Sequence, residues 1–406
     1  MSRIFLSIAL FWALAGGAIA QDFSALARVQ PEQSRITDVG RTGVRVDIAL
    51  SQGVPYRIFT LQDPYRMVLD FNEVDWAGLT SEDFLQSDRI SGVQFGAYVP
   101  GWSRLVLELG APMAVTKAEM LVAEDSGAAL LSLDLKGTDF DAFNASAGAP
   151  RNPGWDLPEP ADVPQAAVRS ADRPLRVMLD PGHGGIDPGA ETDAIDEKTL
   201  MLTFARELRE ILLRSGGYEV VLTRVDDQFV SLERRIALAH RAGADLFISL
   251  HADSLSEGRA HGAVVYTLSN DASDVASAKL AERHDRGDLI SGIDLNGADD
   301  QVTDVLLDMA RQETMPRTSA LAKAIANGLA QQGGPMNGKP LRTASFSVLK
   351  AADIPSVLVE LGFLSSPRDL KNLKDPDWRA RMALGIHRGL EDWHQQDVIR
   401  KSLIGQ

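Results

Sequence analysis

The sequence predicts an α/β catalytic domain with a largely parallel sheet flanked by helices, preceded by a small all-β sandwich domain. From Leu175 onward, apolar strand-like segments alternate with helical patterns, which is typical of layered α/β domains. Between about residues 28 and 136, short segments alternate apolar and polar residues with period two, and turns rich in Pro, Gly and Asp separate them. That spacing is typical of β-sandwiches. A chain of 406 residues is long enough for two such cores.

The first twenty residues have the pattern of a secretory signal peptide. A short basic start at Met1-Ser2-Arg3 is followed by an apolar stretch from Ile4 to Leu14 and by the small-residue site Ala18-Ile19-Ala20. A membrane anchor is the alternative, but the apolar stretch is shorter than the roughly 20 residues that a span requires. We therefore expect residues 1–20 to be removed and the mature chain to be exported without a membrane span.

Charge and composition exclude some classes of function. The formal net charge is −15, which argues against nucleic acid as a partner because phosphate binding requires a basic surface. The chain has no cysteine, so a metal ion would have to be held by His, Asp or Glu.

The domain boundaries follow from changes in pattern. We assign residues 21–136 to the sandwich, 137–173 to a linker rich in Pro and Ala, and 174–398 to the catalytic domain. Residues 270–316 interrupt the catalytic domain with two helical patterns, and an insertion of this length is usually functional. The sandwich strands are expected at 35–39, 43–50, 56–61, 66–71, 90–95 and 103–109.

Two histidines follow apolar strands, where open α/β sheets place their active sites. His183 lies in the turn Asp180-Pro181-Gly182-His183-Gly184-Gly185, and His251 follows the apolar segment 246–250. Glu197 opens the helical pattern between them. Two imidazoles and one carboxylate are the ligand set of a hydrolytic zinc site that keeps one position open for water. A phosphate-binding glycine turn is the alternative, but neither a Lys-Ser/Thr pair nor Gly-x-Gly-x-x-Gly spacing is present.

A second carboxylate, Glu360, lies inside the apolar strand 357–361. A buried carboxylate is costly without a partner, and a nearby zinc ion would supply one. Glu197 could instead merely favour its helix N-terminus through the helix dipole, although that role is compatible with metal binding. The pattern thus predicts one base beside one metal ion, as amide hydrolysis requires.

Residues 175–394 resemble the zinc-dependent N-acetylmuramoyl-L-alanine amidases of the bacterial cell-separation type. The resemblance implies that His183, Glu197 and His251 bind Zn2+ and that Glu360 is catalytic. It also implies cleavage of the amide between the lactyl group of N-acetylmuramic acid and L-alanine. The motifs that carry it are Leu179-Asp180-Pro181-Gly182-His183-Gly184-Gly185, Glu197-Lys198, Thr223-Arg224, Ser249-Leu250-His251-Ala252-Asp253 and Val359-Glu360-Leu361-Gly362-Phe363-Leu364-Ser365.

The N-terminal β region is similar to the peptidoglycan-binding AMIN domain. Together with the signal peptide, the two domains resemble the periplasmic division amidases of Gram-negative bacteria. The resemblance implies a periplasmic enzyme that binds peptidoglycan and splits the septal wall for daughter-cell separation. Two alternatives remain at this point: a zinc peptidase acting on stem peptides, and a wall-binding scaffold with a silent site.

The insertion 270–316 also resembles that of the division amidases. There, one helix plugs the zinc cleft and a second recruits a LytM-type activator of the divisome, so the enzyme is autoinhibited until activated. In this chain, His284 stands where the family plug has its glutamate. His284 could bind the metal, Glu282 or Asp285 could replace it, or plugging could be weaker. The second helix carries an apolar stripe that could dock the activator or simply pack on the catalytic domain: Val302, Val305, Leu306 and Met309.

Overall fold

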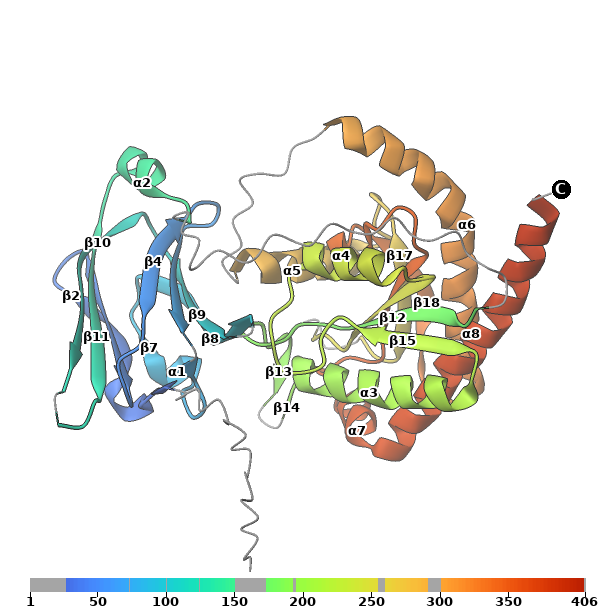
Figure 1. Ribbon diagram of the computed structural model, residues 1–406, viewed down its shortest axis with the longest axis horizontal. Helices are drawn as coiled ribbons and strands as arrows, with labels where there is room; N and C mark the ends of the chain where they lie inside the picture. Colours follow the sequence, from blue (N-terminus) through green and yellow to red (C-terminus); the bar gives the residue numbers. More distant parts are fainter. Residues whose placement is uncertain are drawn as a thin grey trace, which may run out of the picture.

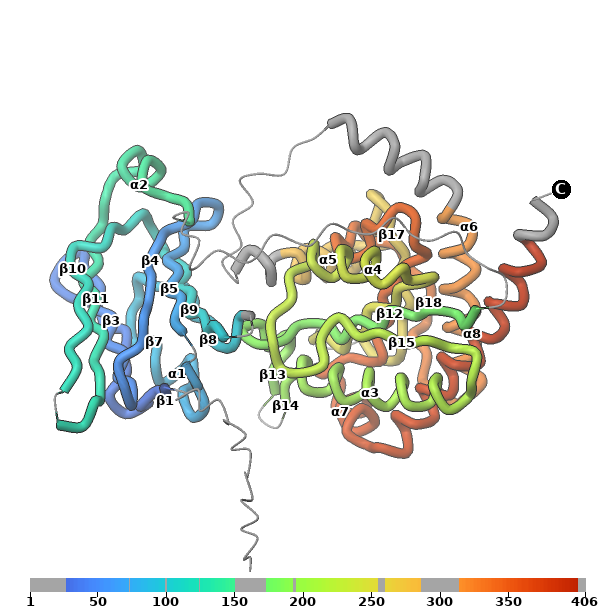
Figure 2. Tube along the Cα trace, in the orientation of Figure 1, coloured from blue at the N-terminus to red at the C-terminus, as the bar shows by residue number. Residues whose placement is uncertain are grey.

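The computed structural model describes residues 27–72, 74–99, 101–123, 125–149, 173–192, 195–254, 260–290 and 301–404 (Figure 2). Side chains are described for these residues except at 99, 286–290, 301–313 and 401–404. The expected signal peptide and residues 150–172 of the expected linker lie outside the described part of the chain. Among the described residues, no helix is both long and apolar enough to span a bilayer.

The N-terminal domain is a sandwich of two sheets, as the period-two pattern predicted (Figure 1), and neighbouring strands are antiparallel except for the parallel pair β2 and β7. One sheet has the order β10-β11-β3-β2-β7 and the other the order β4-β5-β9-β8. The sheets bury the apolar side of each alternating strand against one another. The strands are β2 Arg35–Val39, β3 Gly43–Leu50, β4 Tyr56–Leu61, β5 Arg66–Asn72, β7 Leu85–Gln86, β8 Ile90–Val99, β9 Trp102–Leu109, β10 Met113–Val122 and β11 Ala129–Gly137; β1 Ala27–Arg28 pairs with β6 Val74–Asp75.

Two short helices complete this domain, α1 Ser81–Phe84 and α2 Phe140–Ser146. The second begins inside the segment predicted to be linker. Asp139 caps it by accepting a hydrogen bond from the Ala142 amide, and Phe143 is buried in the sandwich core. The ordered domain therefore extends past residue 136, because a single buried aromatic residue ties the helix to the sheets.

The catalytic domain is built on a six-stranded sheet of order β15-β12-β16-β19-β17-β18 among the described residues. All neighbouring strands are parallel except β17 and β19, which are antiparallel. This confirms the predicted largely parallel sheet. The strands are β12 Leu175–Pro181, β15 Tyr218–Leu222, β16 Leu246–His251, β17 Ala263–Leu268, β18 Met336–Ala344 and β19 Ser356–Glu360; a hairpin of β13 Glu191–Thr192 and β14 Ile195–Asp196 lies outside this sheet.

Helices cover both faces of the sheet (Figure 1). On one face, α3, α6 and α8 form a core with the strands, and α7 joins them through Leu373. On the other face, α4, α5 and the 3-10 turn η2 Ser347–Leu349 cover the strands. The helices are α3 Glu197–Ser215, α4 Leu232–Ala242, α5 Val275–Ile290, α6 Gln301–Gln331, α7 Pro367–Lys374 and α8 Pro376–Ile404.

The insertion 270–316 contains two helices, as its patterns predicted. The first is α5, which packs on the sheet through Leu280 and Ala281. The second is the N-terminal part of α6, which continues through Pro316 to Gln331. The end of the insertion is therefore not the end of a helix, because its second helical pattern is continuous with a core helix.

Candidate active site

Three adjacent parallel strands deliver the predicted site residues to one edge of the sheet. β12, β16 and β19 lie side by side, and His251 at the end of β16 is in register with Glu360 at the end of β19. His183 follows β12 by two residues. The carboxyl ends of parallel strands meet at the same edge, and the sequence could predict this convergence for that reason.

The turn that carries His183 is fixed by hydrogen bonds to its backbone. His183 has a positive φ of 59°, and Gly184 and Gly185 follow with φ of 129° and 59°. Arg224 Nη2 donates to the Gly182 carbonyl at 2.9 Å, and Arg235 Nη2 donates to the His183 carbonyl at 2.9 Å. A non-glycine residue with positive φ is uncommon; the two arginines and the surrounding bonds hold it there.

Asp180 anchors both arginine-bearing segments beneath the site. Its side chain is fully buried and accepts hydrogen bonds from Thr223 Oγ1, Ser249 Oγ and Arg235 Nη1, each at 2.6 Å. Burial raises the pKa of Asp180, but the charge of Arg235 and the hydroxyl donors outweigh it and hold the pKa below its ordinary value. The carboxylate is therefore ionised and ties β12, β16 and α4 together.

The orientation of His183 is set by a carboxylate that sequence reasoning did not single out. Nδ1 lies 2.8 Å from Asp187 Oδ2, so Nε2 is the nitrogen turned toward the cluster. Burial works against a charge on His183, but Asp187 and Glu197 outweigh it and hold the pKa of the imidazole well above its ordinary value. Pairing of one ring nitrogen with a carboxylate is the usual support of a metal-binding histidine.

Glu197 is the first residue of α3 and is completely buried. Its Oε1 accepts from the Ala252 amide at 2.8 Å and lies 3.0 Å from His251 Nδ1. Its Oε2 accepts from the Ala190 amide at 2.9 Å and lies 3.3 Å from His183 Nε2. Burial raises its pKa, but His183 and His251 prevail and hold it well below the ordinary value. Glu197 therefore carries a negative charge between the two imidazoles.

The pKa values of His251 and Glu360 are shifted in opposite directions. Burial and the neighbouring His284 lower the pKa of His251 to about 4, so its imidazole is neutral at physiological pH. Burial and the nearby carboxylates of Glu197 and Asp253 raise the pKa of Glu360 well above its ordinary value. Glu360 Oε2 accepts a hydrogen bond from the Asp253 amide at 3.1 Å.

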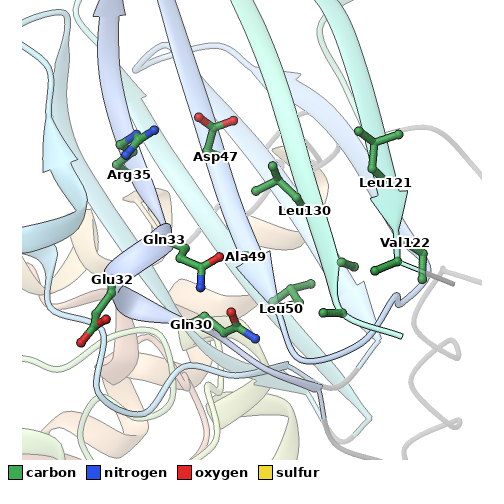
Figure 3. Close-up of a pocket in the computed structure, with 13 residues that line it drawn as sticks. Gln30, Glu32, Gln33, Arg35, Asp47, Ala49, Leu50, Leu121, Val122 and Leu130 are labelled. Carbon is green, nitrogen blue, oxygen red and sulfur yellow. The ribbon is translucent and has the colours of Figure 1, made fainter. Parts of the chain in front are cut away.

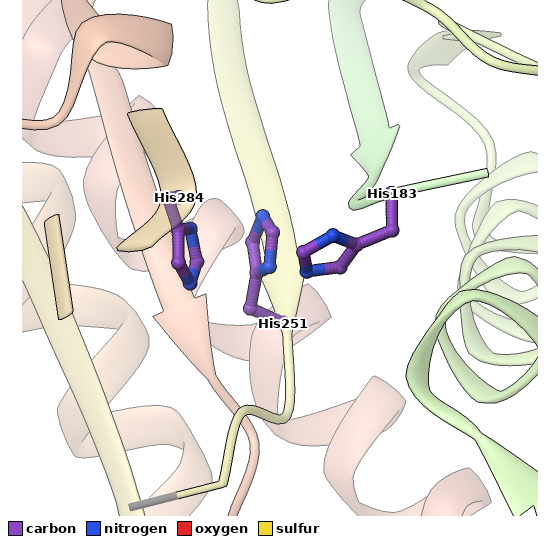
Figure 4. Close-up of side chains that lie close together, drawn as sticks. All are labelled: His183, His251 and His284. Carbon is purple, nitrogen blue, oxygen red and sulfur yellow. The ribbon is translucent and has the colours of Figure 1, made fainter. Parts of the chain in front are cut away.

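A third imidazole, His284 of α5, completes a cluster with His183 and His251 (Figure 4). One nitrogen from each ring lies within 4.8 Å of the others. The ring centroid of His284 lies 4.2 Å from that of His251 and 5.6 Å from that of His183. His284 is only 7% exposed. Of the residues proposed from sequence to plug the site, His284 is the one that the structure places at the two strand-borne histidines.

The other residues of the insertion lie elsewhere. Glu282 is exposed on the solvent side of α5. Asp285 accepts hydrogen bonds from the Ser347 amide and hydroxyl at 3.0 and 2.9 Å and thus caps η2. The side chains of the predicted docking stripe, Val302, Val305, Leu306 and Met309, lie outside the described part of the chain, although their backbone is helical in α6.

Four buried polar atoms around the cluster have no hydrogen-bond partner within the described part of the chain. They are His183 Nε2, His284 Nε2, Glu360 Oε1 and Asp253 Oδ2. His284 Nε2 lies 3.6 Å from Asp253 Oδ2 and 3.9 Å from Glu360 Oε1. Buried polar atoms without partners are rare and need an explanation. A cation held by imidazole and carboxylate would satisfy them, and this donor set suits zinc.

Asp187, Arg235 and Asp253 are the supporting residues that sequence reasoning missed. Asp253 was quoted only as part of a motif, and Asp187 and Arg235 were not singled out at all. Asp187 could have been found, since it lies four residues after His183 in the same Gly-rich turn. Arg235 lies in α4, and no sequence pattern connects it to His183 or Asp180.

Histidines and a carboxylate converge here beside a buried glutamate, and this set of donors could hold a metal ion. A sequence profile of N-acetylmuramoyl-L-alanine amidases matches residues 177–392, and a profile of the AMIN domain matches residues 34–130. The chain belongs to the N-acetylmuramoyl-L-alanine amidase family, and its N-terminal domain is an AMIN domain. Both predicted resemblances are thereby confirmed, and the amidase reading prevails over the peptidase alternative.

Two relatives named N-acetylmuramoyl-L-alanine amidase match most of the chain. The N-acetylmuramoyl-L-alanine amidase AmiC of Escherichia coli is 30% identical over 371 residues, which are 86% of this chain and 85% of that protein. AmiC of Neisseria meningitidis is 30% identical over 377 residues, or 89% of each chain. The structure of the amidase AmiC2 of Nostoc punctiforme is 27% identical and covers 54% of this chain and 97% of that one, with a TM-score of 0.40.

Proposed function

We propose that this amidase is a zinc enzyme in which His183, Glu197 and His251 hold the metal and His284 blocks it. The observation that carries the proposal is the convergence of buried imidazole and carboxylate groups whose polar atoms lack other partners. Negative charge from Glu197 and the neutral state of His251 both favour cation binding. A zinc ion bound there would lower the pKa of a coordinated water and polarise the scissile carbonyl.

Glu360 acts as the base and then as the acid. Its Oε2 is fixed by the Asp253 amide, while Oε1 has no hydrogen-bond partner among the described residues. Its raised pKa makes it a stronger base than an exposed glutamate, which suits it to take a proton from the attacking water. It then delivers this proton to the nitrogen of L-alanine as the amide bond to N-acetylmuramic acid breaks. The lactyl carboxyl group and the free peptide amine are the products.

His284 is the autoinhibitory group. Its ring stands against His251 and shields the strand-borne ligands, while the helix that carries it belongs to an insertion and not to the sheet. Neutral imidazole is a good zinc ligand, so a histidine can do what a carboxylate does in related plugs. While His284 is in place, its imidazole would take up a position on a bound metal ion that water and substrate need.

Activation requires α5 to leave the site, and we assign the trigger to a LytM-type activator of the divisome. The stripe of Val302, Val305, Leu306 and Met309 on the adjoining part of α6 is the docking surface. Leu306→Asp should abolish stimulation by a purified LytM-type activator without changing basal hydrolysis. A Leu306→Asp variant that is stimulated as well as the parent chain would exclude this surface.

The enzyme acts in the periplasm, on septal peptidoglycan, after export by the signal peptide. The AMIN domain binds the wall through the sheet β10-β11-β3-β2-β7. Its groove of about 530 Å³ is lined by polar side chains such as Arg35, Asp47 and Glu32 and by apolar ones such as Leu121 and Leu130 (Figure 3). Full-length Glu360→Gln protein should co-sediment with insoluble sacculi, and the added change Arg35→Glu should weaken this. Unchanged sedimentation of the double variant would move wall binding away from the groove.

Mass spectrometry of digested peptidoglycan tests the reaction directly. Digestion should release stem peptides with a free L-alanine amine and leave glycan whose N-acetylmuramic acid carries a free lactyl carboxyl group. A zinc peptidase would instead shorten the stem peptides and leave L-alanine attached to the sugar. Glu360→Gln protein, carrying its zinc, is the matched control and should release neither product.

A further inference from the structure

The outer face of the AMIN sheet β4-β5-β9-β8 contacts the catalytic domain. Phe59, Leu61, Val68 and Val106 of that sheet form one buried cluster with two catalytic-domain side chains, Ile186 and Phe229. Ile186 is 1% exposed and Phe229 is 4% exposed. No pattern in the sequence indicates this contact, because a strand with apolar residues on both faces is equally typical of a central strand of the sandwich.

Polar and aromatic contacts extend this cluster. The Ile186 amide donates to the Ala97 carbonyl at 3.1 Å, so the end of β8 supplies a backbone partner to the catalytic domain. The ring of Tyr98 stacks on that of Phe229, with centroids 5.7 Å apart and an interplanar angle of 17°. Arg104 Cζ lies over the Tyr98 ring, 3.6 Å from its centroid, and Arg104 bonds the buried Asp70. The aromatic pair is thereby supported from within the AMIN domain.

The contact falls on the turn that carries the first metal ligand. Ile186 is three residues after His183 and directly precedes Asp187, which orients the His183 ring. Gly185, between them, donates to Asp227 Oδ1 and accepts from Lys198 Nζ, at 2.7 and 2.8 Å. The catalytic domain thus binds the amide and the carbonyl of Gly185, and the Ala97 carbonyl binds the Ile186 amide that follows. Ile186 is the apolar residue of this turn, and the AMIN sheet covers it.

We propose that the AMIN domain docks on the turn that carries His183, through contacts with Ile186 and Phe229, and thereby positions this turn. The AMIN domain is then more than a tethered wall-binding module. The docked surface is one sheet of the sandwich, while the other sheet, with its groove, stays available. Wall bound to the AMIN domain would therefore be held at a fixed orientation to the catalytic centre. Tyr98 and Ile186 are positioning residues in this account.

Cross-linking tests the docking in the full chain, whose lack of cysteine gives a clean background. A Cβ built on Gly185 would lie 2.0 Å from the Ala97 carbonyl oxygen and 3.0 Å from the Gln228 carbonyl carbon, so these two residues are close neighbours. Ala97→Cys with Gln228→Cys should be joined within one chain by a short bis-maleimide. The control pair, Leu121→Cys with Gln228→Cys, uses an exposed residue of the opposite sheet. Equal yields for the two pairs would overturn the docking.

Tyr98→Asp in the cross-linking pair tests what holds the domains together. It changes a residue of the AMIN domain only, so it should lower the cross-linking yield severalfold while the catalytic domain keeps its melting temperature. Hydrogen exchange of the 184–187 segment is a second readout without cysteines. This segment should exchange slowly in the parent chain and faster in Tyr98→Asp. Unchanged yield and unchanged exchange would contradict the proposal.

The positioning role rests on the zinc site proposed above and is measured separately. Competition with a chelator should show zinc affinity about tenfold lower in Tyr98→Asp, at the low end of the effects of changes around metal ligands. If the parent chain binds no zinc, the proposed metal site fails while the cross-linking result still stands. If the parent chain binds zinc and Tyr98→Asp binds it equally well, the domains are docked but the AMIN domain does not position the site.

Discussion

The two sides of the histidine cluster are built differently. His183 and His251 follow strands of the parallel sheet, and Asp180, Arg224 and Arg235 bind their surroundings from below. His284 comes from α5, which is attached by one face. Leu280 and Ala281 pack on the sheet, Asp285 caps η2, and Arg283 Nη1 bonds Asp253 Oδ1 at 2.8 Å.

This difference determines how easily each side of the cluster can be displaced. Displacing His183 or His251 would break their buried contacts with Asp187 and Glu197 and disturb the turn and the strand next to the ionised Asp180. Losing such buried contacts is costly. Displacing α5 breaks one apolar patch and a few bonds at its surface. Elements that open in function are expected to come from the less stable parts of a structure. We therefore propose that the strand-borne histidines would be the permanent ligands of a bound metal ion and that His284 would be the removable one.

Removing a permanent ligand should have the largest effect. His183→Ala or His251→Ala leaves an incomplete set of ligands, so zinc and activity should be lost together, with activity falling to background. Metal analysis of the purified variants, beside a dye-release assay on labelled sacculi, measures both. A variant that retained a full equivalent of zinc would show that the assigned ligand does not hold the metal.

Glu360→Gln separates chemistry from metal binding. It removes the base but keeps the shape of the side chain, so activity should fall by about 10²- to 10⁴-fold while zinc stays bound. The matched control is Glu282→Gln, a carboxylate on the exposed side of α5, which should change neither quantity. Loss of zinc from Glu360→Gln would instead make Glu360 a ligand.

The buried contacts of Asp180 beneath the strand-borne histidines should contribute to the free energy of unfolding. Asp180→Asn leaves Arg235 buried without its charge partner, which should cost about 3–5 kcal/mol in the free energy of unfolding. Urea denaturation of both proteins measures this difference.

The stability difference between wild type and Asp180→Asn should depend on pH, and the pKa shift of Asp180 gives the sign of this dependence. The pKa of Asp180 is lowered in the folded protein, so its contribution is present above the unfolded pKa of about 3.9 and is lost as pH falls through the folded pKa. The gap between wild type and Asp180→Asn should therefore shrink only in strongly acidic solution. A gap that narrowed near neutral pH would assign the effect to another group.

Asp187→Asn should have a smaller effect, confined to metal affinity. The amide still holds the turn but carries no charge beside His183 Nδ1, so zinc affinity should fall by about 10- to 100-fold. Chelator competition measures it. Unchanged affinity would mean that the His183 orientation depends on its backbone bonds alone.

The sequence predicted the strand-borne part of the site because a parallel sheet brings strand ends together whatever the loops do. It left the plug open among His284, Glu282 and Asp285. Helical spacing argues against Glu282, which falls on the face opposite Leu280 and His284. It does not separate His284 from Asp285, because Asp285 follows the buried Ala281 by four residues. The roles of Arg235 and Ile186 depend on contacts between segments distant in sequence. No local pattern encodes such contacts.

Basal hydrolysis by His284→Ala tests most directly whether the third imidazole is the removable one. Without activator, this variant should digest labelled sacculi faster than the wild-type chain, should keep its zinc, and should differ from Glu282→Ala, which should match wild type. If His284→Ala bound zinc fully but hydrolysed no faster than wild type, while deletion of residues 270–316 raised the rate, His284 would not be the blocking group.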